Sequence, residues 1–209
     1  MTDRGLLKEL RRDWGALAKR LGGGPLFAPK GPPPLFPTSP EALYAELEEV
    51  LFLWREIRRA PLGRLERRYV NGSWTLKDLL GHLASWAAEF RREVEVAGSR
   101  GTFSYAIPYA LSVLGPNAWN AQAAEAQRPR KLAAILKEFE DETRAVQDLV
   151  LTLPRERLVE TTAFPLAPTG DPSEPFKGTI ALIVLGKCGH DHYHLGRVLA
   201  WLEEQGAAR

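Results

Sequence analysis

The sequence contains one cysteine, Cys188, among its 209 residues. A single thiol excludes an intramolecular disulfide framework and fits a reducing compartment. No apolar run approaches the roughly 20 residues that a membrane-spanning helix needs. Residues 1–21 also lack the apolar core of a signal peptide. We therefore expect a cytoplasmic protein that has no membrane partner.

A strong excess of positive charge is also missing. Lysine and arginine number 28 against 26 acidic residues, which gives a formal net charge of +2. Nucleic-acid binding usually needs a clustered basic face. Here the arginines alternate with acids, as in "REIRRAPLGRLERR", a pattern typical of solvated helix faces. We expect no nucleic-acid partner.

The first part of the chain differs from the rest in composition. Apolar residues recur at helical spacing before residue 22, at Leu6, Leu10, Trp14, Leu17 and Leu21. Glycine and proline then dominate residues 22–40, which indicates an extended strap. We predict that residues 1–39 form an extra N-terminal helix and a proline-rich strap, separate from a domain at residues 40–209. Packing of this helix onto the body of the protein or onto a partner is favoured over a membrane surface.

Residues 40–209 contain four amphipathic stretches of helical period. The first follows a cap at Thr38 or Ser39 and ends before Pro61. The second begins at Thr75, which forms a capping-box pattern with Asp78. The third ends near residue 153 and the fourth covers about 179–204. Hydrophobic content of 44% is ordinary for a soluble protein with a core.

The connections are long and rich in helix-breaking residues. Pro108 and Pro116 predict an irregular segment over residues 98–118, and residues 160–178 form a second proline-rich loop. Pro129 leaves two starts open for the third helix, near residue 117 with a kink or near residue 129. Because no strand-period segment competes, the sequence predicts an all-α four-helix bundle.

Histidine is scarce and unevenly placed. The chain has four histidines, and three of them lie within "CGHDHYHLGRV". His190 and His194 are four residues apart, so they share one helix face with a rise of about 6 Å. Two imidazoles at this spacing can hold one metal ion. His192 projects away from them, toward solvent or a neighbouring element, whereas His82 lies on the inward edge of the second helix and would complete a three-histidine set.

The spacing alone leaves an alternative open. A histidine on an apolar helix face is commonly a core residue that is hydrogen-bonded to a carbonyl or carboxylate oxygen. If a metal is bound, three protein ligands with open positions are typical of a catalytic site, and imidazoles suit zinc or nickel. Cys188 lies off this helix face and is expected to be a buried apolar group.

Two motifs together resemble those of the DinB/YfiT-like superfamily of metal-dependent bundle proteins. These motifs are "WTLKDLLGHLASW" and "HDHYHLGRV", and the resemblance covers about residues 40–204. The residues that fall on the family pattern are Trp74, Thr75, Asp78, His82, Trp86, His190, Asp191, His194, Gly196 and Arg197.

The resemblance implies that His82, His190 and His194 bind a divalent metal. It also implies a DinB-like up-down-down-up order of four helices, which needs a crossover that residues 98–118 can supply. Members of the family often form dimers, so a homodimer is expected. Residues 1–39, His192 and the long loop at 160–178 depart from the family pattern.

The activities known in the family define the functional prediction. They include transfer of a low-molecular-weight thiol such as bacillithiol or mycothiol onto electrophiles, thiol-assisted isomerisation and hydrolysis of reactive toxins. We predict a metal-dependent thiol S-transferase that acts on a small molecule in detoxification. A metal-dependent hydrolase and a non-catalytic binding or interaction protein are the alternatives. Asp191, Asn120 and Arg197 are candidate pocket residues, and Asp191 is expected to cap the helix or to pair with Arg197 or another neighbour.

Overall fold

The computed structural model describes residues 39–70, 72–103, 116–160, 162–163 and 177–206. The chain divides after Phe36 into two units, and all the described residues belong to the second. The predicted N-terminal helix and strap, except Ser39, lie outside the described residues. The domain boundary between residues 39 and 40 therefore stays a prediction.

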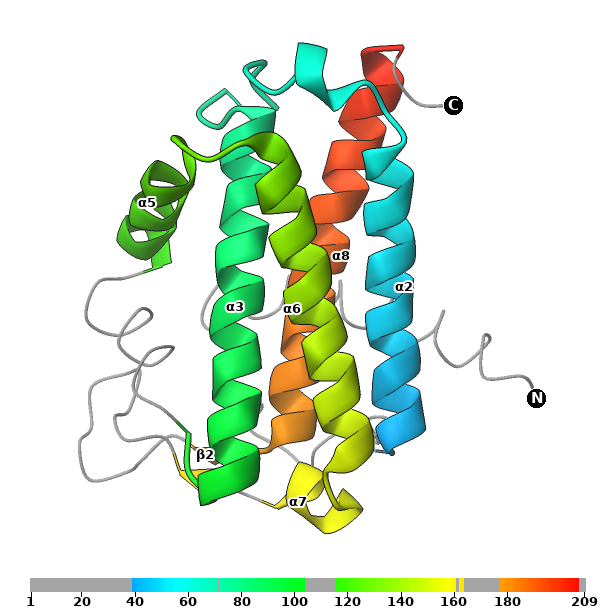
Figure 1. Ribbon diagram of the computed structural model, residues 1–209, viewed down its shortest axis with the longest axis vertical. Coiled ribbons are helices and arrows are strands. Elements are labelled where there is room, and N and C mark those ends of the chain that lie inside the picture. Colours follow the sequence, from blue (N-terminus) through cyan, green and yellow to red (C-terminus); the bar gives the residue numbers. More distant parts are fainter. Residues whose placement is uncertain (1–38, 71, 104–115, 161, 164–176, 207–209) are drawn as a thin grey trace, which may run out of the picture. The chain divides into compact units, whose positions relative to one another are not determined.

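Four long helices form the bundle (Figure 1). They are α2 (Pro40–Arg58), α3 (Leu76–Arg100), α6 (Leu132–Thr152) and α8 (Ile180–Glu204). Helix α3 packs against α6 and α8, and α2 packs against the same two helices. In Figure 1, α2 and α8 run in one direction, whereas α3 and α6 run in the other. The predicted all-α fold and its up-down-down-up order are confirmed.

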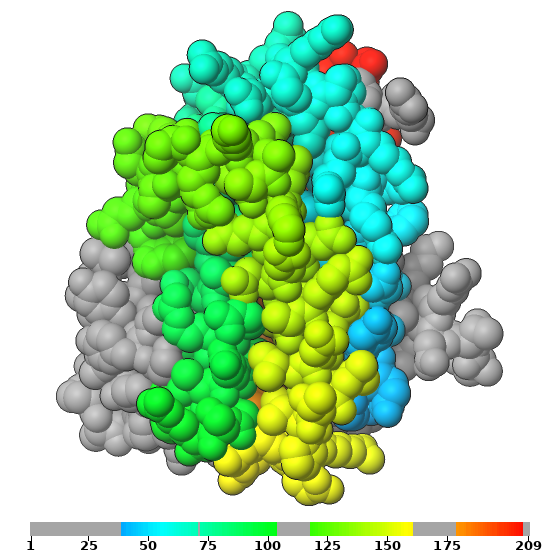
Figure 2. Space-filling model, viewed as in Figure 1, coloured from blue at the N-terminus to red at the C-terminus, as the bar shows by residue number. Residues whose placement is uncertain are grey.

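Shorter elements lie between the long helices. They are η1 (Leu62–Arg64), α5 (Pro116–Gln127), α7 (Arg155–Val159), β1 (Thr162–Ala163) and β2 (Lys177–Gly178). The two short strands pair antiparallel, with Thr162 opposite Gly178. Helix α5 packs on α3, and α7 contacts α8. In Figure 2 the segment between α2 and α3, coloured cyan to teal, covers one end of the bundle. Within the described residues, no helix combines the length and apolar character that a membrane crossing requires.

Side-chain caps fix where three of the long helices begin. The Ser39 hydroxyl accepts a hydrogen bond from the Ala42 amide at 3.2 Å, which decides between the two predicted caps. The predicted capping box is confirmed, because Thr75 Oγ1 accepts from the Asp78 amide and Asp78 Oδ2 accepts from the Thr75 amide, both at 3.1 Å. Thr179 caps α8, because its hydroxyl accepts a hydrogen bond from the Leu182 amide. Each cap satisfies a backbone donor that has no partner inside its helix.

The third bundle helix, α6, begins at Leu132, three residues after the later of the two predicted starts, and the predicted continuous helix from residue 117 is wrong. The region contains two separate helices, α5 and α6, and Pro129 lies in the turn between them. The residue before α6 is Lys131, whose side chain makes no capping hydrogen bond, so the local sequence carried no start signal. The predicted irregular segment is also too wide: α3 continues to Arg100 and ends at Gly101, whose φ of 73° suits glycine. Residues 116–118 are helical as well, and residues 104–115 lie outside the description.

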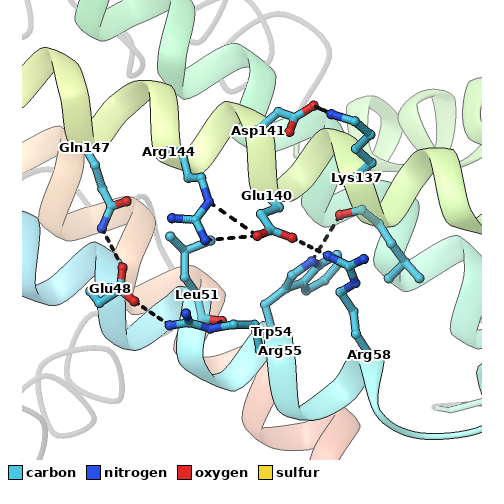
Figure 3. Close-up of polar contacts among 11 residues, drawn as sticks. Glu48, Leu51, Trp54, Arg55, Arg58, Lys137, Glu140, Asp141, Arg144 and Gln147 are labelled. Atoms are coloured by element: carbon cyan, nitrogen blue, oxygen red, sulfur yellow. Dashed lines mark hydrogen bonds and ion pairs between the residues drawn. The ribbon is translucent and has the colours of Figure 1, made fainter.

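A polar seam joins α2 to α6 (Figure 3). Trp54 Nε1 donates to the Leu136 carbonyl at 3.1 Å, and its ring stacks on Phe139 with centroids 4.0 Å apart. Charged and amide groups continue the seam through the pairs Arg58–Glu140, Arg144–Glu140, Gln147–Glu48 and Arg55–Glu48. This seam stabilises the contact between α2 and α6. The histidines lie elsewhere, where α3 contacts α8.

Candidate metal centre

Three histidines from two helices converge between α3 and α8. His82 on α3 and His190 and His194 on α8 each offer a ring nitrogen, and these nitrogens all lie within 4.8 Å of one another. The Nε2 atoms of His82 and His190 are 3.1 Å apart. His82 is 1% exposed, whereas His190 and His194 are only partly buried. The cluster is therefore enclosed on the α3 side and reachable from solvent on the α8 side.

The geometry fits a divalent metal ion. Two imidazoles of a tetrahedral zinc site, each about 2.0–2.1 Å from the ion, have their nitrogens about 3.3 Å apart. Among the described residues, none of the three rings bonds to a main-chain oxygen, and His82 Nδ1 is buried with no hydrogen-bond partner. Core histidines that only fill space are normally satisfied by such partners. The cluster suggests a divalent metal, and its binding by these three residues stays a prediction.

Two of the three imidazoles are held neutral. Burial, together with the neighbouring His190, lowers the pKa of His82 to about 2. The same two causes lower the pKa of His194 to about 3. Metal binding needs the unprotonated nitrogen, so both rings are in the ligand form at neutral pH.

A buried carboxylate orients the third imidazole. Asp191 is 0% exposed, and its Oδ1 lies 3.0 Å from Nδ1 of His190. Burial alone would raise the pKa of Asp191, but the charge of Lys187 and the hydrogen bond from His190 outweigh burial and lower it. An ionised carboxylate only accepts, so Nδ1 of His190 carries a proton, and Nε2 is the ring nitrogen that faces His82. This arrangement is common behind metal-bound histidines.

Asp191 pairs with neighbours on its own helix and not with Arg197. Its other oxygen accepts a charged hydrogen bond from Lys187. Arg197 is exposed and donates to the Tyr193 hydroxyl at 2.8 Å. Of the two predicted pairings of Asp191, the one with Arg197 is therefore wrong. The sequence did contain a signal for Lys187, because a lysine stands in an apolar helix stripe four residues before an aspartate.

Aromatic rings surround the cluster. The centroid of the Trp74 ring lies 5.0 Å from that of His82, and the Trp86 ring lies 6.2 Å from His190. Trp119 of α5 contacts Trp86 with ring centroids 4.0 Å apart and planes tilted by 41°. Apolar walls around a few convergent polar groups are typical of small-molecule sites. Sequence reasoning did not find Trp119, because nothing in its local pattern indicates that α5 folds back on α3.

Asn120 supports this wall and does not belong to a long helix. It was predicted as a pocket residue, and it lies on helix α5, where its Oδ1 accepts a hydrogen bond from Trp86 Nε1 at 3.0 Å. His192 Nε2 lies 4.0 Å from Glu49 of α2, away from the cluster as expected. Cys188 is buried, and burial raises the pKa of its thiol. The thiol is therefore unsuited to act as a nucleophile.

Residues 52–176 match the family model described as the mycothiol maleylpyruvate isomerase N-terminal domain. The matched range covers more than half of the chain and includes α3 with His82. The chain belongs to this family. His190 and His194 lie beyond the matched range, so their assignment to the site depends on the motif in α8 and on the geometry. The resemblance to DinB/YfiT-like proteins is confirmed.

Two solved structures share the fold of this family member. YfiT from Bacillus subtilis, described as "a probable metal-dependent hydrolase with an unusual four-helix bundle topology", has a TM-score of 0.61 and 11% identity, over 86% of this chain and 95% of that chain. The mycothiol-dependent maleylpyruvate isomerase has a TM-score of 0.55 and 9% identity, over 76% of this chain and 60% of that chain. No curated protein sequence matches the chain.

Proposed function

We propose that this protein is a metal-dependent transferase that attaches a low-molecular-weight thiol to small electrophiles. The observation that carries the proposal is the convergence of His82, His190 and His194, within 4.8 Å, in a half-open site walled by tryptophans. The chain matches a family model whose description names mycothiol, which is a low-molecular-weight thiol. This match supports a thiol as the second reactant.

A divalent ion held by the three imidazoles would supply a Lewis acid that keeps a thiol ionised near neutral pH. A free thiol has a pKa of about 8.5 and is mostly protonated there. In the proposed reaction the thiol gives its proton to water, and its sulfur forms a bond to the electrophilic carbon as the leaving group departs. Zinc and nickel are among the ions that imidazole ligands suit.

The protein's own side chains prepare the site. Asp191 holds the proton on Nδ1 of His190, which keeps Nε2 available to the ion. Trp86 and Trp119, whose rings lie against each other, supply apolar surface for an apolar or aromatic electrophile. Asn120 fixes the tilt of Trp86 through the indole N–H. The site thus combines a polar centre with an apolar wall.

The test combines metal content with thiol consumption. Protein loaded with zinc or nickel is mixed with a bimane electrophile and, in turn, with bacillithiol, mycothiol and glutathione. We expect metal-dependent loss of one thiol at a rate above the uncatalysed background. His194→Ala should lower the metal content from about one ion per chain and abolish this turnover.

His192→Ala is the matched control, because His192 lies on the same helix but faces Glu49 of α2. It should keep both the metal and the turnover. Equal metal in the His194→Ala variant and the unchanged protein would contradict the proposed site. Full metal content without consumption of any thiol or electrophile would indicate the non-catalytic binding protein.

Hydrolysis is the second candidate function, and the fold shared with YfiT favours it. The same three imidazoles would then serve a reaction of water with a reactive small molecule. Metal-dependent loss of the electrophile that needs no thiol would favour this hydrolase over the transferase.

A further inference from the structure

A charged pair lies inside the bundle directly behind the histidines. Lys187 is 1% exposed and Asp191 is 0% exposed, and the ammonium donates to Asp191 Oδ2. The other oxygen of Asp191 accepts from His190 Nδ1 at 3.0 Å. One carboxylate therefore joins a buried cation to a candidate metal ligand.

Helix α6 completes the surroundings of the lysine. The Lys187 ammonium donates to Thr143 Oγ1 at 3.3 Å and lies 4.9 Å from the centroid of the Phe139 ring. Both partners belong to the helix diagonally opposite α8. The lysine side chain thus crosses the core, and three side chains contact its ammonium. Because this ammonium is fixed, Asp191 has little freedom to rotate away from His190.

Stability alone does not explain this pair. Replacement of a buried ion pair by apolar residues of similar volume is often neutral or stabilising, because removing two charges from water costs much of what their attraction returns. A carboxylate hydrogen-bonded to the outer nitrogen of a ligating histidine, in contrast, commonly fixes the ring and its tautomer.

We propose that Lys187 and Asp191 are positioning residues of the metal centre. Lys187 holds Asp191 in the rotamer that accepts from His190 Nδ1, and Asp191 in turn points the lone pair of His190 Nε2 at the site shared with His82 and His194. Lys187 also cancels the charge of Asp191, so a bound dication keeps its full charge for an anionic ligand such as a thiolate. The inference rests on the metal binding in the proposed function, but not on its reaction.

Two double variants test the role without leaving an unpaired buried charge. Lys187→Met with Asp191→Ala removes the acceptor of the His190 proton. Lys187→Met with Asp191→Asn keeps an acceptor oxygen. Zinc affinity is measured by competition with a chromophoric chelator, and folding by the thermal midpoint of the metal-free protein. We expect both variants to fold with midpoints near that of the unchanged protein.

The alanine variant should bind zinc about 10–100-fold more weakly, and the asparagine variant should recover at least part of that loss. Unchanged zinc affinity in a folded alanine variant would overturn the proposal. An equal loss in both variants would overturn it too, because the hydrogen bond would then not be the cause. Thiol-transfer activity plays no part in either measurement, so failure of the proposed reaction is distinguishable from failure of this inference.

Lys137 and Asp141 provide a matched control. They form an ion pair at the same four-residue spacing on α6, with 73% and 55% of their side chains exposed. Lys137→Met with Asp141→Ala should change neither the zinc affinity nor the folding midpoint.

A measurement on the unchanged protein covers the case in which the double variants do not fold. Nitrogen-15 NMR of the imidazole rings in the metal-free protein distinguishes the two neutral tautomers. We expect His190 to carry its proton on Nδ1. A neutral ring with its proton on Nε2 and none on Nδ1 would contradict the role of Asp191.

Discussion

His82 combines three properties that rarely occur together in a histidine. It is almost fully buried, its Nδ1 has no partner among the described residues, and its Nε2 faces another imidazole at 3.1 Å. An unpartnered buried polar atom costs free energy unless something else compensates. A ligand shared with His190 and His194 would supply that compensation.

The lowered pKa values of His82 and His194 predict how the metal-free protein responds to acid. The unfolded chain takes up protons near pH 6.5, whereas the folded protein resists protonation down to about pH 3 and about pH 2. Stability is therefore complete above about pH 6.5 and falls as the pH drops from there toward 3. Each histidine contributes up to about 1.4 kcal/mol per pH unit to this fall. Urea midpoints measured in chelator at pH 7.5, 6.5 and 5.5 should show the decline.

His82→Gln should remove about half of this slope, since one of the two neutral imidazoles is lost. A His82→Gln variant with the slope of the unchanged protein would show that His82 does not resist protonation.

At this scale the sequence identified the histidine cluster better than the residues that support it. His82, His190 and His194 were selected from spacing and resemblance, because metal ligands need particular residue types at particular intervals, and the structure brings the three together. Their binding of a metal stays a prediction. Lys187 lies on the buried face of α8, but a pattern of burial in the sequence does not say which polar group lies across the core. That partner is Thr143, on a helix 44 residues away in sequence.

At the scale of the helices, the packing of α5 on α3 shapes the wall of the site. Gly81 makes this approach feasible: a Cβ at residue 81 would lie 2.7 Å from Gln127 Cβ, at the end of α5. Gln127 Nε2 also donates to Ser85 Oγ at 2.9 Å, which ties α5 to the next turn of α3. The position of Trp119 over Trp86 depends on this close contact.

Gly81→Ala should therefore separate the two helices and destabilise the protein by about 1–3 kcal/mol. Thermal unfolding measures the loss, and tryptophan fluorescence should report a changed environment for Trp86 and Trp119. Gly196→Ala is the matched substitution on α8, where nothing lies within 4 Å of the new Cβ. It should stabilise the protein by up to about 1 kcal/mol through helix propensity. Equal shifts in the two variants would mean that the contact with α5 is not tight.

Helix starts were predictable where a side chain caps the first turn, as at Thr75 and Thr179. The start of α6 was not, because Lys131 makes no such bond and the apolar spacing of the region continues past Pro129. The division into α5 and α6 depends on where α5 packs, and that contact with α3 is set by residues distant in sequence. Local pattern does not encode it.

At the scale of the whole molecule, metal binding should be coupled to folding, since the ligands come from two helices that meet only in the bundle. An ion that binds the folded state at 100 times its dissociation constant stabilises it by about 2.7 kcal/mol. Addition of a chelator should lower the thermal midpoint of the metal-loaded protein. The His194→Ala variant should show little shift, and an equal shift in both would argue against this site.

The order of the helices was available only through resemblance. Amphipathic periodicity identifies helices but not their neighbours, so composition and spacing allowed any four-helix arrangement. The parallel pair α3 and α6 needs a chain that returns along the bundle between residues 101 and 131. In the sequence, the helix breaks at Pro108 and Pro116 indicated a long connection there. The homodimer stays a prediction, which sedimentation of the purified protein would test.

His82 and His190 are 108 residues apart in sequence. An ion bound by both histidines would close the chain between them, which includes α6, into a loop. Closing so long a loop removes much of the freedom of the unfolded chain, so the ion would work as a reversible cross-link in a protein that has no disulfide. Under a pulling force applied at residues 40 and 206, the loaded protein should extend in two stages, with the segment between the histidines released last.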